Sequence, residues 1–241
     1  MKNSIYLKQT PSTNDLLWKM LKENDLPEGF VVQTDFQLAG KGQIGNSWES
    51  ENSKNLLFSL LLYPEQIRPD QQFVISQIVS LAIQKTLAQY TDEITIKWPN
   101  DIYWKNKKIA GILIENSLQG KHIKFSVIGI GLNINQMEFK SDAPNPVSLR
   151  QIIGKSINRK LILRSIYQNI MDLYQNYDIL KIQTKYFNLL YKKEGFHSFK
   201  ADEESFIARI FAVHQDGRLE LETEDGEYRS FYFKEVSFES K

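Results

Sequence analysis

The sequence contains no cysteine, and this absence removes several classes of protein from consideration. Disulfide scaffolds, zinc ribbons, iron–sulfur clusters and thiol nucleophiles all depend on cysteine. Histidine is also scarce, since only His122, His197 and His214 occur. They stand far apart, without the spacing of a metal site and without a neighbouring nucleophile motif. No metal ligand and no histidine chemistry are therefore predicted.

An excess of charge of either sign is missing as well. The chain has 30 basic and 29 acidic side chains, a formal net charge of +1. Proteins that bind nucleic-acid duplexes usually carry a basic surface, so no nucleic-acid partner is expected. Long hydrophobic runs are also lacking. The most apolar one, 56–63, includes Ser59 and is far shorter than the roughly 18 residues that a membrane helix requires. With no secretion signal among the first ten residues, we expect a soluble, cytoplasmic protein without membrane contact.

What is present is an ordinary globular composition, with 241 residues, of which 41% are hydrophobic and 24% charged. That length allows one or two domains with a sizeable core. Apolar residues recur at helical spacing in four segments, 16–21, 73–87, 161–174 and 179–190, and the second helix is expected to open at Pro69-Asp70. Strands are predicted at 31–36, 56–63, 94–98, 109–114 and 123–130, the last two as a hairpin around Gly120.

The pattern changes near residues 191–195. Beyond this point the predicted strands are short and are separated by two tight-turn signals, at 215–217 and 224–226. About 45 residues of such strands favour a small barrel appended to a larger domain that mixes helices and strands. We therefore predict an α+β protein with one domain at residues 1–192 and a second at 193–241.

A glycine-rich loop follows the first predicted strand. Gly40, Gly42 and Gly45 fit the G-x-G-x-x-G spacing of dinucleotide-binding proteins, but that fingerprint needs a helix directly after the loop. Residues 46–53 have no helical period and the next element is a strand, so the dinucleotide interpretation fails. A protein kinase is excluded because the H-R-D and D-F-G motifs are absent.

Two interpretations of the loop remain open. Its backbone amides and Lys41 would hold an anion while Trp48 covers a flat base. Alternatively, the loop is an ordinary surface turn whose tryptophan packs on its own domain. The residues of the loop do not decide between the two.

Two further clusters combine backbone access with polar side chains. In Lys97-Trp98-Pro99-Asn100-Asp101, a short strand places Lys97 on the face opposite Ile94 and Ile96, and Pro99 ends the strand. A lysine at a strand end is commonly just solvated, but in a closed site it neutralises a phosphate. The second cluster is Gly129-Ile130-Gly131-Leu132-Asn133. Gly111, inside a strand pattern, indicates a bulge or a close approach of the backbone to a ligand.

Taken together and in this order, the motifs resemble those of biotin–protein ligases. The resemblance begins at Ser12-Thr13-Asn14, continues through Gln37 and the glycine loop to Trp48, and then includes the K-W-P-N-D run, Lys108-Ile109-Ala110-Gly111 and residues 129–133. Residues 217–219 and 234–237 are similar to the family's small SH3-like domain. The resemblance thus covers nearly the whole chain. It implies a mixed-sheet catalytic domain of the biotin/lipoate ligase type, followed by an SH3-like β-barrel.

The activity that the resemblance implies is an ATP-dependent, AMP-forming ligation in two steps. Biotin and ATP form biotinoyl-5'-AMP, and a lysine of a biotin carboxyl carrier protein then takes the biotin. Lys97 is the first candidate for the catalytic cation and Lys41 the second. The biotin contacts implied by the motifs are Ser12, Thr13, Asn14, Gln37, Lys41, Gly42, Gln43, Lys97 and Gly111. A serine-threonine-asparagine run before a helix is also an ordinary cap, and the two roles are compatible.

The nucleotide contacts implied by the same resemblance are Gly40, Lys41, Gly42, Gln43, Trp48, Lys97 and Asn133. Trp48 is expected to cover the adenine on a loop that orders when the adenylate forms. Mg²⁺ is expected to arrive with ATP, bound by phosphates and water, so no protein ligand is named. Trp18, Trp98 and Trp104 are expected to be packing residues.

The sequence departs from the family in two respects. Family loops are richer in arginine, whereas this loop has Lys41, Gln43 and Asn46, and lysine lacks the bidentate fork of arginine. The family's bifunctional members also carry an N-terminal DNA-binding domain. The resemblance to the catalytic domain begins here already at Ser12, so we expect a monofunctional ligase without that domain. The alternatives are a lipoate/octanoate–protein ligase or transferase of related fold and a non-catalytic biotin-binding regulator. The acceptor's identity and a homodimer through a sheet edge stay open.

Overall fold

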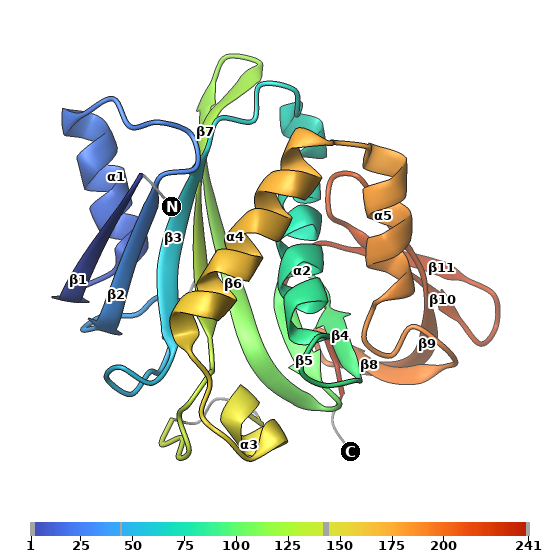
Figure 1. Cartoon of the computed structure of the whole chain (residues 1–241). Coiled ribbons are helices and arrows are strands. Elements are labelled where there is room, and N and C mark those ends of the chain that lie inside the picture. Colours follow the sequence, from blue (N-terminus) through green and yellow to red (C-terminus); the bar gives the residue numbers. More distant parts are fainter. Residues whose placement is uncertain (1–2, 44, 142–144, 240–241) are drawn as a thin grey trace.

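A computed structural model describes residues 3–43, 45–141 and 145–239; Ile44 of the glycine-rich motif lies outside these ranges. The larger part is built on a seven-stranded mixed sheet in the order β1-β2-β3-β7-β6-β5-β4 (Figure 1). β1 pairs with β2 in parallel and every other neighbouring pair is antiparallel. The strands are β1 Ser4–Thr10, β2 Val31–Gln37, β3 Leu56–Leu62, β4 Ile94–Lys97, β5 Asp101–Trp104, β6 Lys107–Gln119 and β7 His122–Leu132.

The two faces of this sheet have different coverings, because side chains alternate along each strand. Apolar residues of β3, β6 and β7, most of them at even-numbered positions, enter the main core. There α2 (Phe73–Leu87) lies on the strands, while α4 (Arg159–Gln175) and α5 (Ile179–Asn188) pack on α2 (Figure 1). Odd-numbered residues face α1 (Thr13–Glu23), which lies mainly over β2, β3 and β7. The rest of that face is left open for the site.

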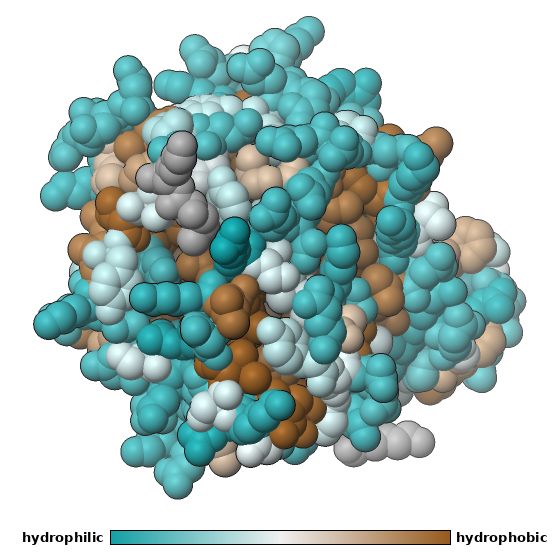
Figure 2. Space-filling view, in the orientation of Figure 1, coloured by the Kyte–Doolittle hydropathy of each residue, from teal (hydrophilic) through white to brown (hydrophobic). Residues whose placement is uncertain are grey.

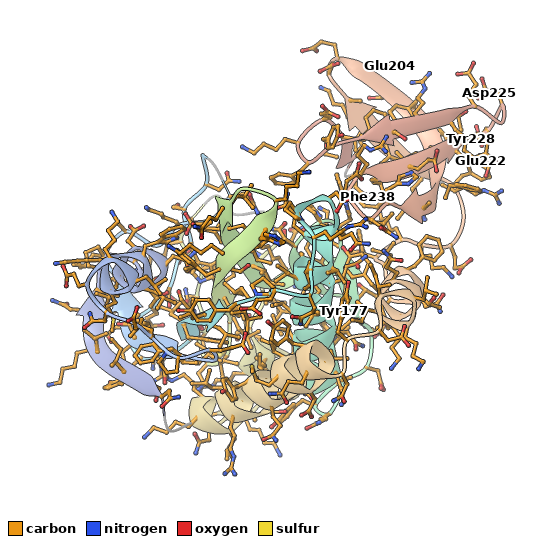
Figure 3. The ribbon with its side chains drawn as sticks, turned by 90° about the horizontal axis from the view of Figure 1, so that it is seen from above. Tyr177, Glu204, Glu222, Asp225, Tyr228 and Phe238 are labelled. Carbon is orange, nitrogen blue, oxygen red and sulfur yellow. The ribbon has the colours of Figure 1, made fainter. Side chains whose placement is uncertain are left out.

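A second sheet of five antiparallel strands closes the chain, in the order β11-β10-β9-β8-β12. Figure 3 shows these strands at one side of the larger layer, with Glu204 and Asp225 at their far end. Its inner residues, including Phe199, Ile210 and Leu221, belong to the same hydrophobic cluster as the large sheet. The strands are β8 His197–Ala201, β9 Glu204–Val213, β10 Leu219–Thr223, β11 Tyr228–Phe231 and β12 Ser237–Phe238.

The α+β prediction is confirmed, and so are the four helices, the five strands and the turns around Gly120, Gly217 and Gly226. One boundary was wrong. Residues Pro69–Gln71 form a separate 3₁₀ turn, and α2 begins only at Phe73. Three short elements were not predicted: β1, β5 and α3 (Leu149–Ile153). Strand β1 is mostly exposed, so its pattern is weak, and α3 has little more than one turn.

The face of the molecule shown in Figure 2 is mostly hydrophilic, with apolar side chains gathered in smaller areas between polar ones. Within the ranges described, no helix has the length and apolar character needed to span a bilayer.

Candidate active site

A cavity of about 860 Å³ opens on the face of the large sheet beside α1. Its floor is formed by the odd-numbered residues of β6 and β7, where Gly111 and Gly131 are direct partners across the two strands. Gly129 continues the floor towards α1. Since these three positions carry no side chain, the floor is flat and other groups approach its backbone closely.

One end of the cavity is polar and is built at the start of α1. The Ser12 hydroxyl caps the helix by accepting a hydrogen bond from the Asp15 amide at 3.4 Å. The Thr13 amide donates to Gln37 Oε1 at 2.8 Å, and the Thr13 hydroxyl lies 3.0 Å from the same oxygen. The Asn14 amide group reaches Glu115 Oε2 at 2.7 Å. Ser12 is thus both cap and lining residue, and the amides and hydroxyls of the motif converge on one end of the cavity.

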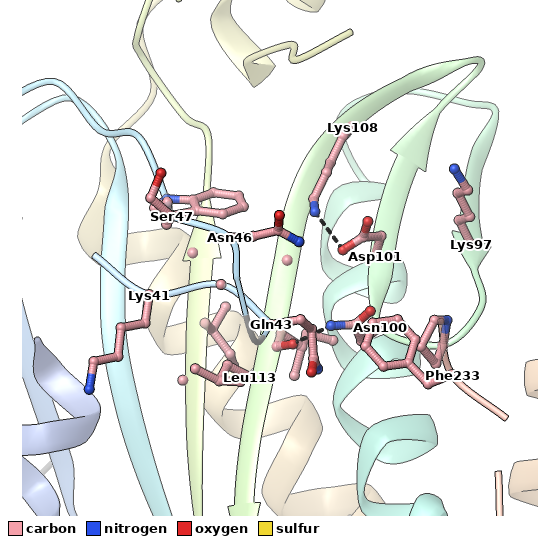
Figure 4. A pocket seen from close by; sticks show the side chains of 18 of the residues that line it. Lys41, Gln43, Asn46, Ser47, Lys97, Asn100, Asp101, Lys108, Leu113 and Phe233 are labelled. Atoms are coloured by element: carbon pink, nitrogen blue, oxygen red, sulfur yellow. Dashed lines mark hydrogen bonds and ion pairs between the residues drawn. The ribbon is translucent and has the colours of Figure 1, made fainter. Parts of the chain in front are cut away.

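Lys97 lies at the opposite end, at the end of β4 (Figure 4). Its side chain points away from the buried Ile94 and Ile96, as the alternation predicted. The ammonium donates to the Tyr103 hydroxyl at 3.2 Å and lies over the Tyr103 and Phe238 rings. None of the ion pairs found among the described residues involves Lys97. Burial lowers the pKa of its ammonium, Asp101 opposes that shift and Lys108 adds to it.

A second lysine stands beside Lys97 but is neutralised. Lys108 Nζ forms an ion pair with Asp101 Oδ1 at 2.8 Å (Figure 4). Next to it, Asn100 donates to the Ile112 carbonyl at 2.6 Å and accepts, through its own carbonyl, from the Ile112 amide. These bonds fix the K-W-P-N-D turn, with its cis Trp98-Pro99 bond, against β6. In the part of the chain that the structure describes, no group of three acidic or histidine side chains is arranged to hold a metal ion.

The glycine loop is folded back on itself by hydrogen bonds of its own. The Gly42 amide, expected to face an anion, donates to the Asn46 carbonyl at 2.9 Å, and the Gln43 carbonyl accepts from the Asn46 amide. Lys41 Nζ, expected to supply the second positive charge, pairs with Asp15 Oδ1 at 2.7 Å and points towards α1, away from Lys97 (Figure 4). In this conformation the Gly42 amide is used in the hairpin of the loop and the Lys41 ammonium in its ion pair, although both residues line the cavity.

Trp48 lies directly on the glycine floor. A Cβ at Gly131 would stand 2.4 Å from its ring, and one at Gly111 would stand 2.9 Å away. The ring therefore packs on its own domain, one of the two interpretations that the sequence left open, while it also lines the cavity. Its buried indole N–H has no hydrogen-bond partner among the residues that the structure describes. The buried Oδ1 of Asn133, directly after β7, likewise lacks a partner within the described ranges, and Asn133 also lines the cavity.

All predicted site residues except Gly40 line this cavity. Gly40 lies against the backbone of Trp48, whose amide donates to the Gly40 carbonyl at 2.9 Å. Trp18 packs on Phe125, as predicted. Trp98 donates its indole N–H to the Gly217 carbonyl at 2.9 Å and also lines the cavity.

Several residues that line or support the cavity were not predicted. The C-terminal strands and the turn before β12 contribute Phe199, Phe233, Val236 and Phe238 to the cavity, which no spacing in the sequence indicated. Ser59 and Glu115 stand behind the polar end and bond to Asn14. For Ser59 a signal existed, because it is the one hydroxyl within the apolar run 56–62.

Comparison with known proteins agrees with this geometry. Residues 6–133 match the model of the biotin/lipoate A/B protein ligase family. The bifunctional ligase/repressor BirA of Bacillus subtilis is 33% identical over 165 residues, which cover 65% of this chain and 49% of that protein. Biotin–protein ligase 2 of Arabidopsis thaliana is 32% identical over 187 residues, 73% of this chain and 55% of that protein. The chain spans about half the length of the curated relatives it matches.

Among solved structures, the biotin protein ligase from Aquifex aeolicus in complex with biotin and ATP is similar over 100% of both chains, with a TM-score of 0.82 and 25% sequence identity. The match includes the seven-stranded sheet and the small antiparallel sheet that follows it. The chain therefore belongs to the biotin/lipoate A/B protein ligase family.

Proposed function

We propose that the chain attaches biotin to a lysine of a biotin carboxyl carrier protein in two steps. The carboxylate of biotin attacks the α-phosphate of ATP, which gives biotinoyl-5'-AMP and releases pyrophosphate. The amine of the acceptor lysine then attacks the acyl carbon and AMP leaves. The proposal rests on the family, on the names of the relatives and on one observation, a lysine without a carboxylate partner in a cavity whose other end carries amides and hydroxyls.

Lys97 is proposed as the catalytic residue. The first step brings two anions together, so a fixed positive charge is needed where the carboxylate meets the phosphate. Lys97 meets this need because its ammonium is partly buried and has no carboxylate partner among the described residues. An anion bound there would compensate for the solvation that burial removes from the Lys97 ammonium, so the ammonium would stay charged. Lys108 lies nearby, with its charge already balanced by Asp101.

Lys41 is proposed as a second cation that engages after the loop rearranges. Its ion pair with Asp15 is half-exposed, since the two side chains keep 51% and 47% of their surface accessible. Such pairs contribute about 0–1 kcal/mol, so a phosphate competes for Lys41 at little cost. Opening the loop hairpin would also free the Gly42 amide. Gln43 and Gly40 belong to the same loop and would move with it.

The nucleotide is proposed to lie on the glycine floor near Trp48. The unpartnered Asn133 Oδ1 is an acceptor, and the exocyclic amine of adenine is a matching donor. Gly111 and Gly131 allow a flat ring to approach the backbone closely. Ser12, Thr13, Asn14 and Gln37 are proposed to hold the ureido ring of biotin at the other end. Mg²⁺ is proposed to enter as the ATP complex, held by phosphates and water.

We propose that the catalytic domain comprises residues 1–192 and that 193–241 form the SH3-like domain. The partners are a biotin carboxyl carrier domain and the two small substrates, in the cytoplasm. Strand β1 is the edge of the large sheet at which a second copy would pair in a homodimer.

The test is transfer of labelled biotin to a purified biotin-acceptor domain in the presence of MgATP, with lipoate as a parallel substrate. ATP-dependent covalent labelling with biotin is the expected result. Labelling with lipoate alone would assign the chain to the lipoate branch of the family. Tight biotin binding without transfer and without pyrophosphate release would make it a non-catalytic regulator.

A further inference from the structure

The polar end of the cavity is backed by two side chains that do not line it. Ser59 of β3 is fully buried and Glu115 of β6 is partly buried. Both contact Asn14, which does line the cavity. They come from strands far apart in the sequence, and neither is assigned a role by the proposed reaction.

The sheet holds Asn14 in one place. Ser59, Gly129 and Leu113 are direct partners across β3, β7 and β6, so they form one row over which the Asn14 side chain lies. A Cβ at Gly129 would stand 2.5 Å from Asn14 Oδ1, so only glycine leaves room for the amide. Asn14 Nδ2 also lies 3.4 Å from the Leu113 carbonyl.

Glu115 decides which way the Asn14 amide faces. A carboxylate accepts hydrogen bonds and cannot donate them, so the atom 2.7 Å from Glu115 Oε2 must be the Asn14 NH₂ group. Asn14 Oδ1 therefore faces Ser59 Oγ, at 2.6 Å. Because an amide oxygen only accepts, the single hydroxyl proton of Ser59 is used in this bond.

A count of protons then gives the polarity of Thr13. Ser59 Oγ also lies 2.7 Å from Thr13 Oγ1, which in turn lies 3.0 Å from Gln37 Oε1. Three contacts, Ser59–Asn14, Ser59–Thr13 and Thr13–Gln37, share two hydroxyl protons. With the proton of Ser59 given to Asn14, Ser59 has none left for Thr13, and the Thr13 hydroxyl donates its own proton to Gln37 Oε1. The Thr13 oxygen, which lines the cavity, is left with free lone pairs and short of one donor.

We propose that Ser59 and Glu115 are positioning residues that make this end of the cavity accept hydrogen bonds, and so make it selective for a ring that carries N–H groups. This inference rests on the proposed function and deepens it. The cyclic urea of biotin supplies the missing N–H donor. The dithiolane ring of lipoate has no N–H, and it would leave the buried acceptors unpaired, which disfavours binding.

Ser59→Ala tests the chain of bonds directly, with Ser126→Ala as its matched control. Ser126 is also fully buried and donates to an amide oxygen, Asn116 Oδ1, at 2.7 Å, but it lies outside the cavity. Binding of biotin and of biotin methylated at one ureido nitrogen is measured by calorimetry without ATP, and transfer is measured at saturating biotin.

Ser59→Ala is expected to weaken biotin binding at least 10-fold while transfer at saturating biotin and the KM for ATP change less than 3-fold. N-methylation is expected to weaken binding at least 10-fold in the wild type and less than 3-fold in Ser59→Ala, because the acceptor is then no longer oriented. Ser126→Ala is expected to lower the unfolding midpoint and to leave both ligand affinities unchanged. Equal N-methyl penalties in the wild type and Ser59→Ala would overturn the inference.

Glu115→Gln gives an independent check that preserves side-chain size. Glutamine presents either an oxygen or an NH₂ group to Asn14, so the amide of Asn14 is no longer held in one orientation. The preference for biotin over its N-methyl analogue is expected to fall at least 3-fold. An unchanged preference would remove Glu115 from the chain. If the wild type binds and transfers biotin and the variants behave like the wild type, only this inference is refuted. If the wild type neither binds nor transfers biotin, the proposed function is refuted as well.

Discussion

The charged state of Lys97 is disfavoured by the burial of its side chain. Its ammonium donates to Tyr103 and lies near the Phe238 ring, and burial lowers its pKa. Asp101, the acidic group that favours its charge, is already paired with Lys108. An anion bound between Lys97 and the glycine floor therefore interacts with an ammonium that is already partly desolvated, which strengthens the attraction between them.

Lys97→Ala is expected to lower the rate of adenylate formation at least 10³-fold without lowering the stability of the fold. Removing this charge leaves no buried carboxylate unpaired, because Asp101 keeps Lys108. Single-turnover pyrophosphate release measures the rate and thermal unfolding measures stability. Lys105→Ala is the control, since Lys105 is half-exposed and paired with Glu93 outside the cavity. Unchanged turnover in Lys97→Ala would remove the residue from the mechanism.

The lowered pKa of Lys97 also predicts a pH dependence. The protonated form carries the charge that the reaction needs, so activity is lost as pH rises through the lowered pKa. The alkaline fall in kcat/KM is expected to begin below the ordinary lysine value of about 10.4. Arginine stays charged throughout this range, so Lys97→Arg is expected to have a lower plateau and no alkaline fall up to about pH 10. The same fall in both proteins would point to another group.

At the scale of elements, the paired glycines of β6 and β7 decide where the loop that carries Trp48 lies. Gly131→Ala would place a methyl group where the Trp48 ring now lies, 2.4 Å from it. The ring stands on a surface loop, outside the strands and helices, so stability is expected to change by less than about 1 kcal/mol. The KM for ATP is expected to rise about 10-fold, with biotin affinity unchanged.

A double-mutant comparison isolates this contact. If the penalty comes from the ring, the Gly131→Ala change should have no further effect on the KM for ATP in a Trp48→Ala background. Full additivity of the two changes would mean that Gly131 meets the nucleotide directly.

Another link between elements joins α4 to the sheet. Arg159 bonds Asp35 Oδ1 at 2.9 Å and the Asn55 carbonyl at 2.8 Å, and the Tyr6 hydroxyl donates to Asp35. Arg159 and Asp35 side chains are only 20% and 16% exposed. Burial alone would raise the pKa of Asp35, but the bonds from Tyr6 and Arg159 outweigh it and the pKa is lowered.

The link predicts a stability that depends on pH. A lowered carboxyl pKa stabilises the fold above the unfolded value of about 3.9, and the gain is lost as pH falls through the folded value. Arg159→Ala is expected to cost about 2 kcal/mol at pH 7 in urea unfolding, and the difference from wild type should shrink towards pH 3. Arg68→Ala, which breaks an exposed pair with Asp70, is expected to cost less than about 0.5 kcal/mol at either pH.

At the scale of the whole molecule, the two sheets share one hydrophobic core. Gly217, in the turn between β9 and β10, accepts from the Trp98 indole and lies against Phe73 of α2. Its φ of +93° is in the region that favours glycine. The C-terminal sheet is thereby fixed beside the K-W-P-N-D turn, and its Phe233 and Phe238 reach the cavity.

Gly217→Ala is expected to cost about 2–3 kcal/mol, measured by urea unfolding with a single transition. Gly226→Ala is the matched control, since it has a φ of +84° with open space around it and should cost only the backbone strain of about 1–2 kcal/mol. The difference between the two variants measures packing between the sheets. Equal costs would mean that the C-terminal sheet is held elsewhere.

The sequence by itself determined the elements and the motifs. A continuous apolar run predicted β3, helical spacing predicted α2, and two strand-like runs around Gly120 predicted the hairpin of β6 and β7, because burial imposes such patterns locally. Of the site residues that the motifs predicted, all but Gly40 line the cavity. Strand β1 and helix α3 escaped because an exposed edge strand and a single turn bury too little to leave a pattern.

Only the tertiary structure decided how these groups face one another. It paired Gly111 with Gly131, placed Ser59 behind Asn14 and brought Phe238 to Lys97. It also gave Lys41 to Asp15 and the Gly42 amide to its own loop, which the motif had assigned to an anion. The physical reason is that hydrogen bonds and ion pairs form between whichever groups the packing brings together. Strand register and helix placement control this over separations of 45 to 101 residues, as the bonds of Asn14 with Ser59 and Glu115 demonstrate.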